Sequence, residues 1–251
     1  MKRIVMKGGW VLALAGLLLA GACAPLSPPP ARPAPAAECH PQPDFARDQY
    51  IVGYGSLMNT ASRRRTAPGA GPGVPVRVRG YERRWIARGS DIGFSATYLG
   101  VVPAPGGRLN AILYRVADDA EVLATDARER GYCRRSLQPD QVEWLVEAPR
   151  PEGEVWIYEI RPERRQPPSR RWPIVQSYVD IFLSGCLDLE ARFGLVGFAA
   201  ECLRSTRGWS RHWVNDRVHP RRPFIHQPMA GRIDRLLHRE LPEFFEAIRI
   251  E

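Results

Sequence analysis

The first half of the folded chain shows the alternation of apolar and polar positions that is typical of β-strands. The apolar run at residues 50–53 ends in Gly53-Tyr54-Gly55-Ser56, so a buried strand opens directly into a glycine turn. Further strands are predicted over residues 74–86, 95–102, 109–116, 141–147 and 154–160. Mostly antiparallel strands around one short helix predict an α+β fold, built as a small β-barrel.

A short helix is predicted between the strands at 109–116 and 141–147. Asp118 stands at the N-cap position and Glu121 at the third helical position, which together form a capping-box pattern. Gly131 supplies the expected stop signal. The segment between these signals contains the acidic residues Asp126 and Glu129.

Helical spacing dominates the C-terminal part of the chain. A helix is expected to begin at Pro173, after a Pro- and Arg-rich linker at 161–171. A second helix is predicted over 189–204, with apolar residues at helical spacing: Phe193, Val196, Ala200 and Leu203. A third covers 233–248 and is interrupted or kinked at Pro242. We expect these helices to pack on the barrel.

The first 22 residues have the pattern of a signal peptide. A basic start precedes an apolar stretch at 10–22 that is too short to cross a bilayer comfortably. Small residues then precede Cys23, which resembles the bacterial lipoprotein box and predicts a lipid anchor on Cys23, facing the periplasm. The alternative is that Ala20-Gly21-Ala22 is an ordinary cleavage site, which would release a soluble periplasmic or secreted protein.

Composition divides the remaining chain into a tether and one domain. Residues 23–43 are rich in Pro and Ala, which favours an extended spacer that cannot bury a core. Residues 44–251 are long enough for a single domain with a substantial core, and its helical extension starts at about residue 173.

Charge and residue usage exclude several functions. The chain carries 36 basic and 27 acidic residues, yet both lysines lie within the first 22 residues. Schiff-base lysines and phosphate-loop lysines are thereby excluded from the mature protein. The arginines are scattered in pairs beside Asp and Glu, which indicates a solvated face, so we expect no nucleic-acid partner.

Cysteine and histidine spacing predicts no metal site. His212, His219 and His226 recur at intervals of seven, but intervening prolines break any helix that would align them, and no C-x-x-C occurs. The four cysteines after Cys23 allow three complete disulfide pairings, which spacing does not rank securely. A Cys186–Cys202 bridge between neighbouring helices is the first expectation, and two buried free thiols are the alternative.

Two motifs together carry the candidate chemistry. Tyr54-Gly55-Ser56-Leu57 forms a turn that can present several backbone N–H groups to an anion, and Asp126-x-x-Glu129 is followed closely by Tyr132. In this order the motifs resemble those of the gamma-glutamylcyclotransferase superfamily, including its ChaC-like members. The resemblance covers about residues 50–160 and the helical C-terminal part loosely. One departure is the absence of a glycine expected near Ala111.

The resemblance implies a cofactor-independent cyclisation of small γ-glutamyl compounds. The free α-amine attacks its own side-chain carbonyl, forming 5-oxoproline and expelling an amine or amino acid. Glu129 is then the catalytic carboxylate that moves the protons, with its pKa raised by partial burial. The implied substrate-binding residues are the amides around Gly55, Ser56 and Leu57, which hold the α-carboxylate, together with Tyr54 and Tyr132.

Other interpretations remain open at this point. Glu129 is flanked by arginines, the usual setting of a solvent-facing helix residue, and Asp126 is expected to be structural. Glu82 and Asp91 are rival carboxylates without a motif. The alternative function is a non-catalytic envelope lipoprotein that uses the same fold to bind a ligand or partner. The enzyme hypothesis requires the Gly55 turn and Glu129 to face one pocket.

Overall fold

The computed structural model describes residues 39–89, 95–222 and 229–251. The predicted signal peptide, Cys23 and most of the predicted tether lie outside these residues. Cys39 is already buried and forms a disulfide with Cys133, so the described domain includes residues ahead of the predicted start at Asp44. No helix in the described ranges has the length and apolar character needed to cross a membrane.

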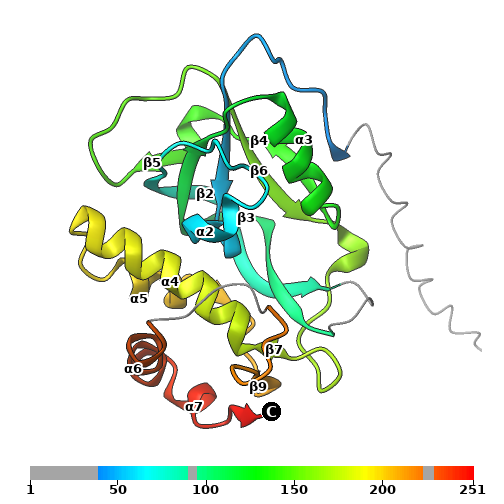
Figure 1. The fold of residues 1–251 in the computed structure, drawn as a ribbon, viewed down its shortest axis with the longest axis vertical. Helices are drawn as coiled ribbons and strands as arrows, with labels where there is room; N and C mark the ends of the chain where they lie inside the picture. The colour runs from blue at the N-terminus through cyan, green and yellow to red at the C-terminus, as the bar shows by residue number, and fades with distance from the viewer. Residues whose placement is uncertain (1–38, 90–94, 223–228) are drawn as a thin grey trace, which may run out of the picture. The chain divides into compact units, whose positions relative to one another are not determined.

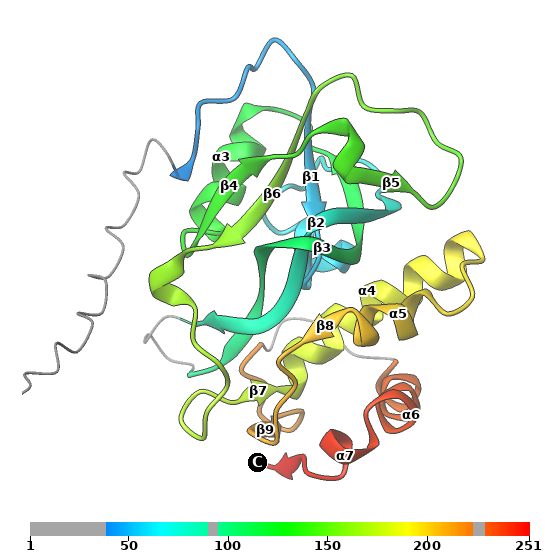
Figure 2. The same ribbon diagram turned by 180° about the vertical axis from the view of Figure 1, so that it is seen from behind.

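A seven-stranded sheet forms the centre of the domain (Figures 1 and 2). Along the sheet the order is β4 (Tyr132–Ser136), β6 (Glu154–Ile160), β1 (Gln49–Gly53), β3 (Thr97–Arg115), β2 (Val74–Arg88) and β5 (Val142–Trp144), and β8 (Thr206–Arg207) pairs with β2. The pairs β1–β3, β2–β3, β2–β5 and β4–β6 are antiparallel, whereas β1 and β6 are parallel. The mixed α+β class is confirmed.

The predicted closure into a barrel is wrong, because the described strands form an open sheet that ends at β4 and β5. The strands predicted at 95–102 and 109–116 are one strand, β3, which bends along its length. Its first half reaches β6 at Val101, and its second half pairs with β1 at Ile112. The sheet therefore curls around β1 without joining its edges.

The helix α3 (Asp119–Arg128) begins as the capping pattern predicts. The Asp118 side chain accepts a hydrogen bond from the Glu121 N–H at 2.9 Å. The Glu121 carboxylate binds the backbone N–H groups of Gly69 and Ala117 instead of closing a capping box. The helix ends at Arg128, before the predicted stop, so Glu129 is its C-cap and begins the turn into β4.

The C-terminal helices differ in their boundaries from the prediction. After the short strand β7 (Ile174–Val175), α4 (Gln176–Phe193) runs through the predicted break near residue 189. It ends because Gly194 adopts a left-handed conformation with φ 66°. The next helix, α5 (Phe198–Arg204), starts late, and Val196 lies in the turn with 98% of its surface exposed.

The last segments form a small second sheet and two helices. Strand β9 (Trp213–Asn215) lies between β7 and β10 (Arg249–Ile250). The predicted interruption at Pro242 is confirmed, since α6 (Ala230–Glu240) ends before it and α7 (Pro242–Phe245) starts there.

Helices α4 and α5 pack against the main sheet through the larger of two hydrophobic clusters (Figure 1). Its largest members include Trp85, Tyr114, Tyr178, Phe182 and Trp213. Cys186 of α4 and Cys202 of α5 form a disulfide, as predicted from their neighbouring helices. These contacts place α4 beside the turn that follows β1.

Candidate active site

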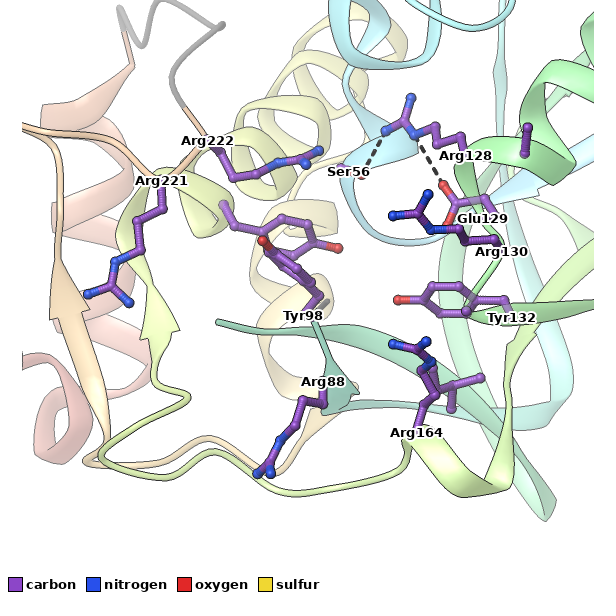
Figure 3. A pocket seen from close by; sticks show the side chains of 15 residues that line it. Ser56, Arg88, Tyr98, Arg128, Glu129, Arg130, Tyr132, Arg164, Arg221 and Arg222 are labelled. Atoms are coloured by element: carbon purple, nitrogen blue, oxygen red, sulfur yellow. Dashed lines mark hydrogen bonds and ion pairs between the residues drawn. The ribbon is translucent and has the colours of Figure 1, made fainter. Parts of the chain in front are cut away.

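A cavity of about 460 Å³ lies where the turn after β1, the end of α3, strand β3 and helix α4 meet (Figure 3). This volume is within the range of roughly 300–1,000 Å³ that is usual for small-ligand sites. Ser56, Glu129 and Tyr132 line it together with Tyr98 and Tyr178. Segments that are far apart in the sequence thus share one pocket.

Glu129 lies at the wall of this cavity, at the point where α3 unwinds. Its N–H donates to the carbonyl of Thr125, and its carbonyl accepts from the N–H of Tyr132, each at 2.8 Å. The side chain is 15% exposed, and Arg128 Nε lies 3.1 Å from its Oε1. Burial raises the pKa of the Glu129 carboxyl above its ordinary value, although the charge of Arg128 opposes the shift. A raised pKa suits a carboxylate that must both take and return a proton.

Arg128 connects Glu129 to the turn that follows β1. Its Nη2 donates to the hydroxyls of Ser56 and Ser62, each at 3.0 Å, and its Nη1 donates to the Ser62 carbonyl at 2.7 Å. The arginine neighbour that made Glu129 resemble a solvated surface residue is therefore part of the site. It holds the Glu129 carboxylate and the Ser56 hydroxyl in one hydrogen-bonded chain (Figure 3).

The Gly55 turn is packed against Tyr178 from α4. Gly55 is the N-cap of the 3-10 helix η1 (Ser56–Met58), which has no side-chain cap. A Cβ on Gly55 would lie 2.7 Å from the Tyr178 hydroxyl oxygen, so the turn has no space for a larger residue. Burial raises the pKa of Tyr178 to about 12, while a backbone hydrogen bond from Ser56 acts in the opposite direction.

The other predicted site residues divide into two groups. Tyr132 lines the cavity and donates its hydroxyl to the Leu99 carbonyl at 2.8 Å. Tyr54 and Leu57 are buried in the two cores, and neither these two nor Gly55 is among the residues that line the cavity. The Tyr54 hydroxyl donates to the carbonyl of Tyr158, which gives it a structural partner.

The expected structural role of Asp126 agrees with its contacts. Its carboxylate accepts from Tyr158 Oη at 2.6 Å and from Arg134 Nη1 at 3.0 Å. Glu82 pairs with Arg84 away from the cavity, and Asp91 lies outside the described residues. Glu129 is the one carboxylate among the described residues that line the cavity.

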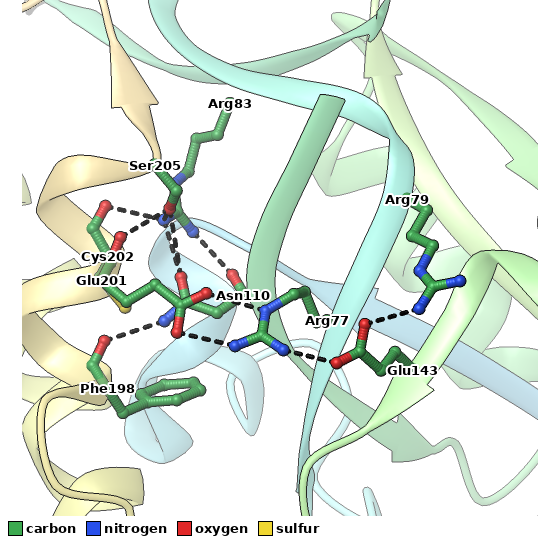
Figure 4. A network of polar contacts seen from close by, with 9 residues as sticks. All are labelled: Arg77, Arg79, Arg83, Asn110, Glu143, Phe198, Glu201, Cys202 and Ser205. Carbon is green, nitrogen blue, oxygen red and sulfur yellow. Dashed lines mark hydrogen bonds and ion pairs between the residues drawn. The ribbon is translucent and has the colours of Figure 1, made fainter. Parts of the chain in front are cut away.

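A buried arginine binds the backbone carbonyl of Tyr54 in the turn after β1. Figure 4 shows the contacts of this arginine, Arg83, with Asn110, Cys202 and Ser205. Arg83 of β2 is fully buried, and its guanidinium donates to acceptors on four other segments: the carbonyls of Tyr54, Asn110 and Cys202, the Asn110 side chain, and the hydroxyls of Ser205 and Thr206. Burial lowers its pKa to about 9, so the group remains charged at pH 7. This network joins β1, β2, β3 and α5 next to the turn.

Sequence reasoning missed the residues that reach the cavity from distant segments. Tyr178 comes from α4, Tyr98 from β3, and Arg222 from the segment after β9. No local motif marks any of the three. Within the described ranges no group of three or more metal-ligating side chains occurs, and His226 lies outside those ranges.

Comparison with known proteins finds solved structures of limited similarity. The sequence matches no protein-family model and no curated protein. One similar solved structure is a gamma-glutamyl cyclotransferase, with a TM-score of 0.45 and 12% identity; the match covers 61% of this chain and 86% of that chain. Another is an uncharacterised Homo sapiens protein, with a TM-score of 0.44 and 13% identity, covering 65% of this chain and 92% of that chain. A third is a yeast gamma-glutamyl cyclotransferase specific to glutathione, with a TM-score of 0.40 and 11% identity, covering 64% of this chain and 98% of that chain. At such scores the case for a function rests on the cavity residues.

Proposed function

We propose that this protein is a gamma-glutamylcyclotransferase-like enzyme that converts small γ-glutamyl compounds to 5-oxoproline and a free amine or amino acid. The observation that carries the proposal is that Ser56 and Glu129, from the two sequence motifs, line one cavity. Arg128 joins their side chains directly. Gly55 itself does not line the cavity, so within the turn it is Ser56 that supports the proposal.

The reaction needs orientation and proton transfer. The α-amine and the γ-carbonyl belong to one molecule, so a site that holds the folded conformer supplies much of the rate acceleration. The Glu129 carboxylate takes a proton from the substrate ammonium group. The amine then forms the new C–N bond, and the protonated Glu129 returns the proton to the leaving nitrogen as the amide bond breaks. The ring nitrogen still carries one proton in excess, which passes to the released amine, so the products are 5-oxoproline and an ammonium group. Tyr178 and Tyr132 form the walls that keep this conformer in place.

The direct test is release of 5-oxoproline from γ-glutamylalanine by the full chain and by Glu129→Gln. Loss of the proton-transferring group is expected to lower kcat by about 10²–10⁴-fold. The matched control is Glu82→Gln, which removes a carboxylate outside the cavity and is expected to keep the activity. Full activity in Glu129→Gln would remove Glu129 from this role. No release by the unaltered chain from a panel of γ-glutamyl compounds would leave the binding-protein alternative.

We further propose that the protein is exported and anchored to the membrane through a lipid on Cys23. The lipoprotein-like residues before Cys23 support this proposal. An intact cell wall is a poor substrate there, because the amine of its γ-linked glutamate is acylated and cannot attack. Free γ-glutamyl peptides and exported glutathione fit the chemistry. Cys23→Ser is expected to move the protein from the membrane fraction to the soluble fraction, and an unchanged distribution would refute the anchor.

A further inference from the structure

The cavity has a strong excess of positive charge. Six arginines line it, from four parts of the chain: Arg88, Arg128, Arg130, Arg164, Arg221 and Arg222. Glu129 is the one acidic residue among the described residues of the lining. Catalysis by a single carboxylate does not require this excess, so it points to the charge of the ligand.

Several of these arginines already have partners. Arg128 binds Glu129 and the serines of the turn. Arg221 forms an ion pair with Glu251 and donates to the Ser95 carbonyl, and Arg88 stacks over the Trp172 ring with 4.8 Å to its centroid. These three arginines therefore also bind other parts of the protein, and their presence at the cavity does not by itself indicate a ligand.

Arg130 and Arg164 differ from this group. Both side chains are exposed, and within the part of the chain that the structure describes neither guanidinium makes a hydrogen bond or ion pair. They lie on either side of Tyr132, and Figure 3 shows both at the cavity. Two guanidinium groups with open donors are suited to bind a carboxylate.

Their position selects one end of the substrate. Figure 3 shows Ser56 and Arg128 at one end of the cavity, Arg164 at the opposite end, and Glu129 between them. Glu129 must lie at the amide bond that breaks. If the γ-glutamyl half occupies the Ser56 end, the leaving group extends past Glu129 toward Arg130 and Arg164.

We propose that the preferred substrates carry an acidic leaving group, of which γ-glutamylglutamate is the simplest, and that Arg130 and Arg164 bind its side-chain carboxylate. This inference rests on the proposed cyclotransferase function. A solvent-exposed ion pair contributes a modest amount, so each arginine is expected to favour the acidic substrate by roughly two- to five-fold.

The test compares two isosteric substrates, γ-glutamylglutamate and γ-glutamylglutamine, on the full chain. The kcat/KM ratio is expected to favour the acidic dipeptide and to decrease with added salt, because exposed charges are screened. Arg130→Gln and Arg164→Gln should each lower the ratio, and the double variant should bring it close to one. The control Arg108→Gln removes an exposed positive charge of β3 outside the cavity lining and should leave the ratio unchanged.

A ratio near one in the unaltered chain, or a ratio that survives in the double variant, would overturn the inference. Turnover of both dipeptides at equal rates would leave the cyclotransferase proposal standing. If neither dipeptide is turned over, the cyclotransferase proposal is decided by γ-glutamylalanine and the wider panel, and the role of the two arginines is decided by calorimetric binding of the same two dipeptides. Tighter binding of the acidic dipeptide supports them as an anion site, whereas equal binding or no binding refutes it.

Discussion

Replacing Arg128 by Gln tests how the site sets the proton affinity of Glu129. The carboxylate must be deprotonated to accept the substrate's proton, so kcat/KM falls on the acidic side as Glu129 is protonated. Arg128 lies 3.1 Å from Glu129 and its charge lowers the Glu129 pKa, against the larger effect of burial. Without the charge of Arg128, burial raises the pKa of Glu129 further. The acidic limb of the pH profile is therefore expected to move to higher pH.

The size of this shift follows from the exposure of the pair. The two side chains are 16% and 15% exposed, so solvent screens their contact only partly. A hydrogen bond between charged groups in such a setting contributes about 1.5–3 kcal/mol. One pKa unit corresponds to about 1.4 kcal/mol, so the limb is expected to move by roughly one to two pH units.

The assay is kcat/KM for γ-glutamylalanine as a function of pH, with Arg108→Gln as the control for loss of one positive charge. Loss of the Arg128 contacts to Ser56 and Ser62 is expected to lower the plateau of the profile as well, but a change of plateau does not move the limb. A limb that stays in place, or moves to lower pH, would show that Glu129 is not the group whose ionisation controls the rate.

Three further changes test the surroundings of the site. Gly55→Ala should destabilise the fold by about 1–3 kcal/mol in urea unfolding, because its Cβ meets the Tyr178 hydroxyl, and Tyr178→Phe in the same chain should restore part of the loss. Arg83→Met should cost about 3 kcal/mol or more, since it leaves several buried acceptors without a donor; a loss below about 1 kcal/mol would refute that role. Glu129→Gln should raise the melting temperature at pH 7. Because the folded-state pKa of Glu129 is raised, the stability that it contributes is complete below the ordinary carboxyl pKa and is lost as pH rises through the raised value. A lower melting temperature at pH 7 would contradict this.

Local patterns carried much of the prediction. Strand β6 was expected over 154–160 and occupies Glu154–Ile160. Asp118 was expected as an N-cap and binds the Glu121 N–H. These features depend on alternation or on hydrogen bonds between residues a few positions apart, so the sequence contains the whole signal.

Errors occurred where distant segments decide the outcome. Strand β4 was not predicted, because Tyr132–Ser136 becomes a strand through its pairing with β6. The expected barrel is an open sheet because closure depends on which edges pair, and periodicity along one strand carries no information about this. The same limit explains why spacing did not single out the disulfide between Cys39 and Cys133, which are 94 residues apart.

The sequence by itself determined the α+β class, the glycine turn after β1 and the place of Glu129 at the end of a short helix. Tertiary structure alone decided what surrounds Glu129. It buried the carboxylate, which raises its pKa, brought Tyr178 of α4 against Gly55, and gathered arginines from four parts of the chain into one cavity. The physical reason is the sequence separation of the interacting residues. Turns and caps depend on residues a few positions apart, whereas burial and the charge of a cavity depend on many residues that come together only when the chain has folded.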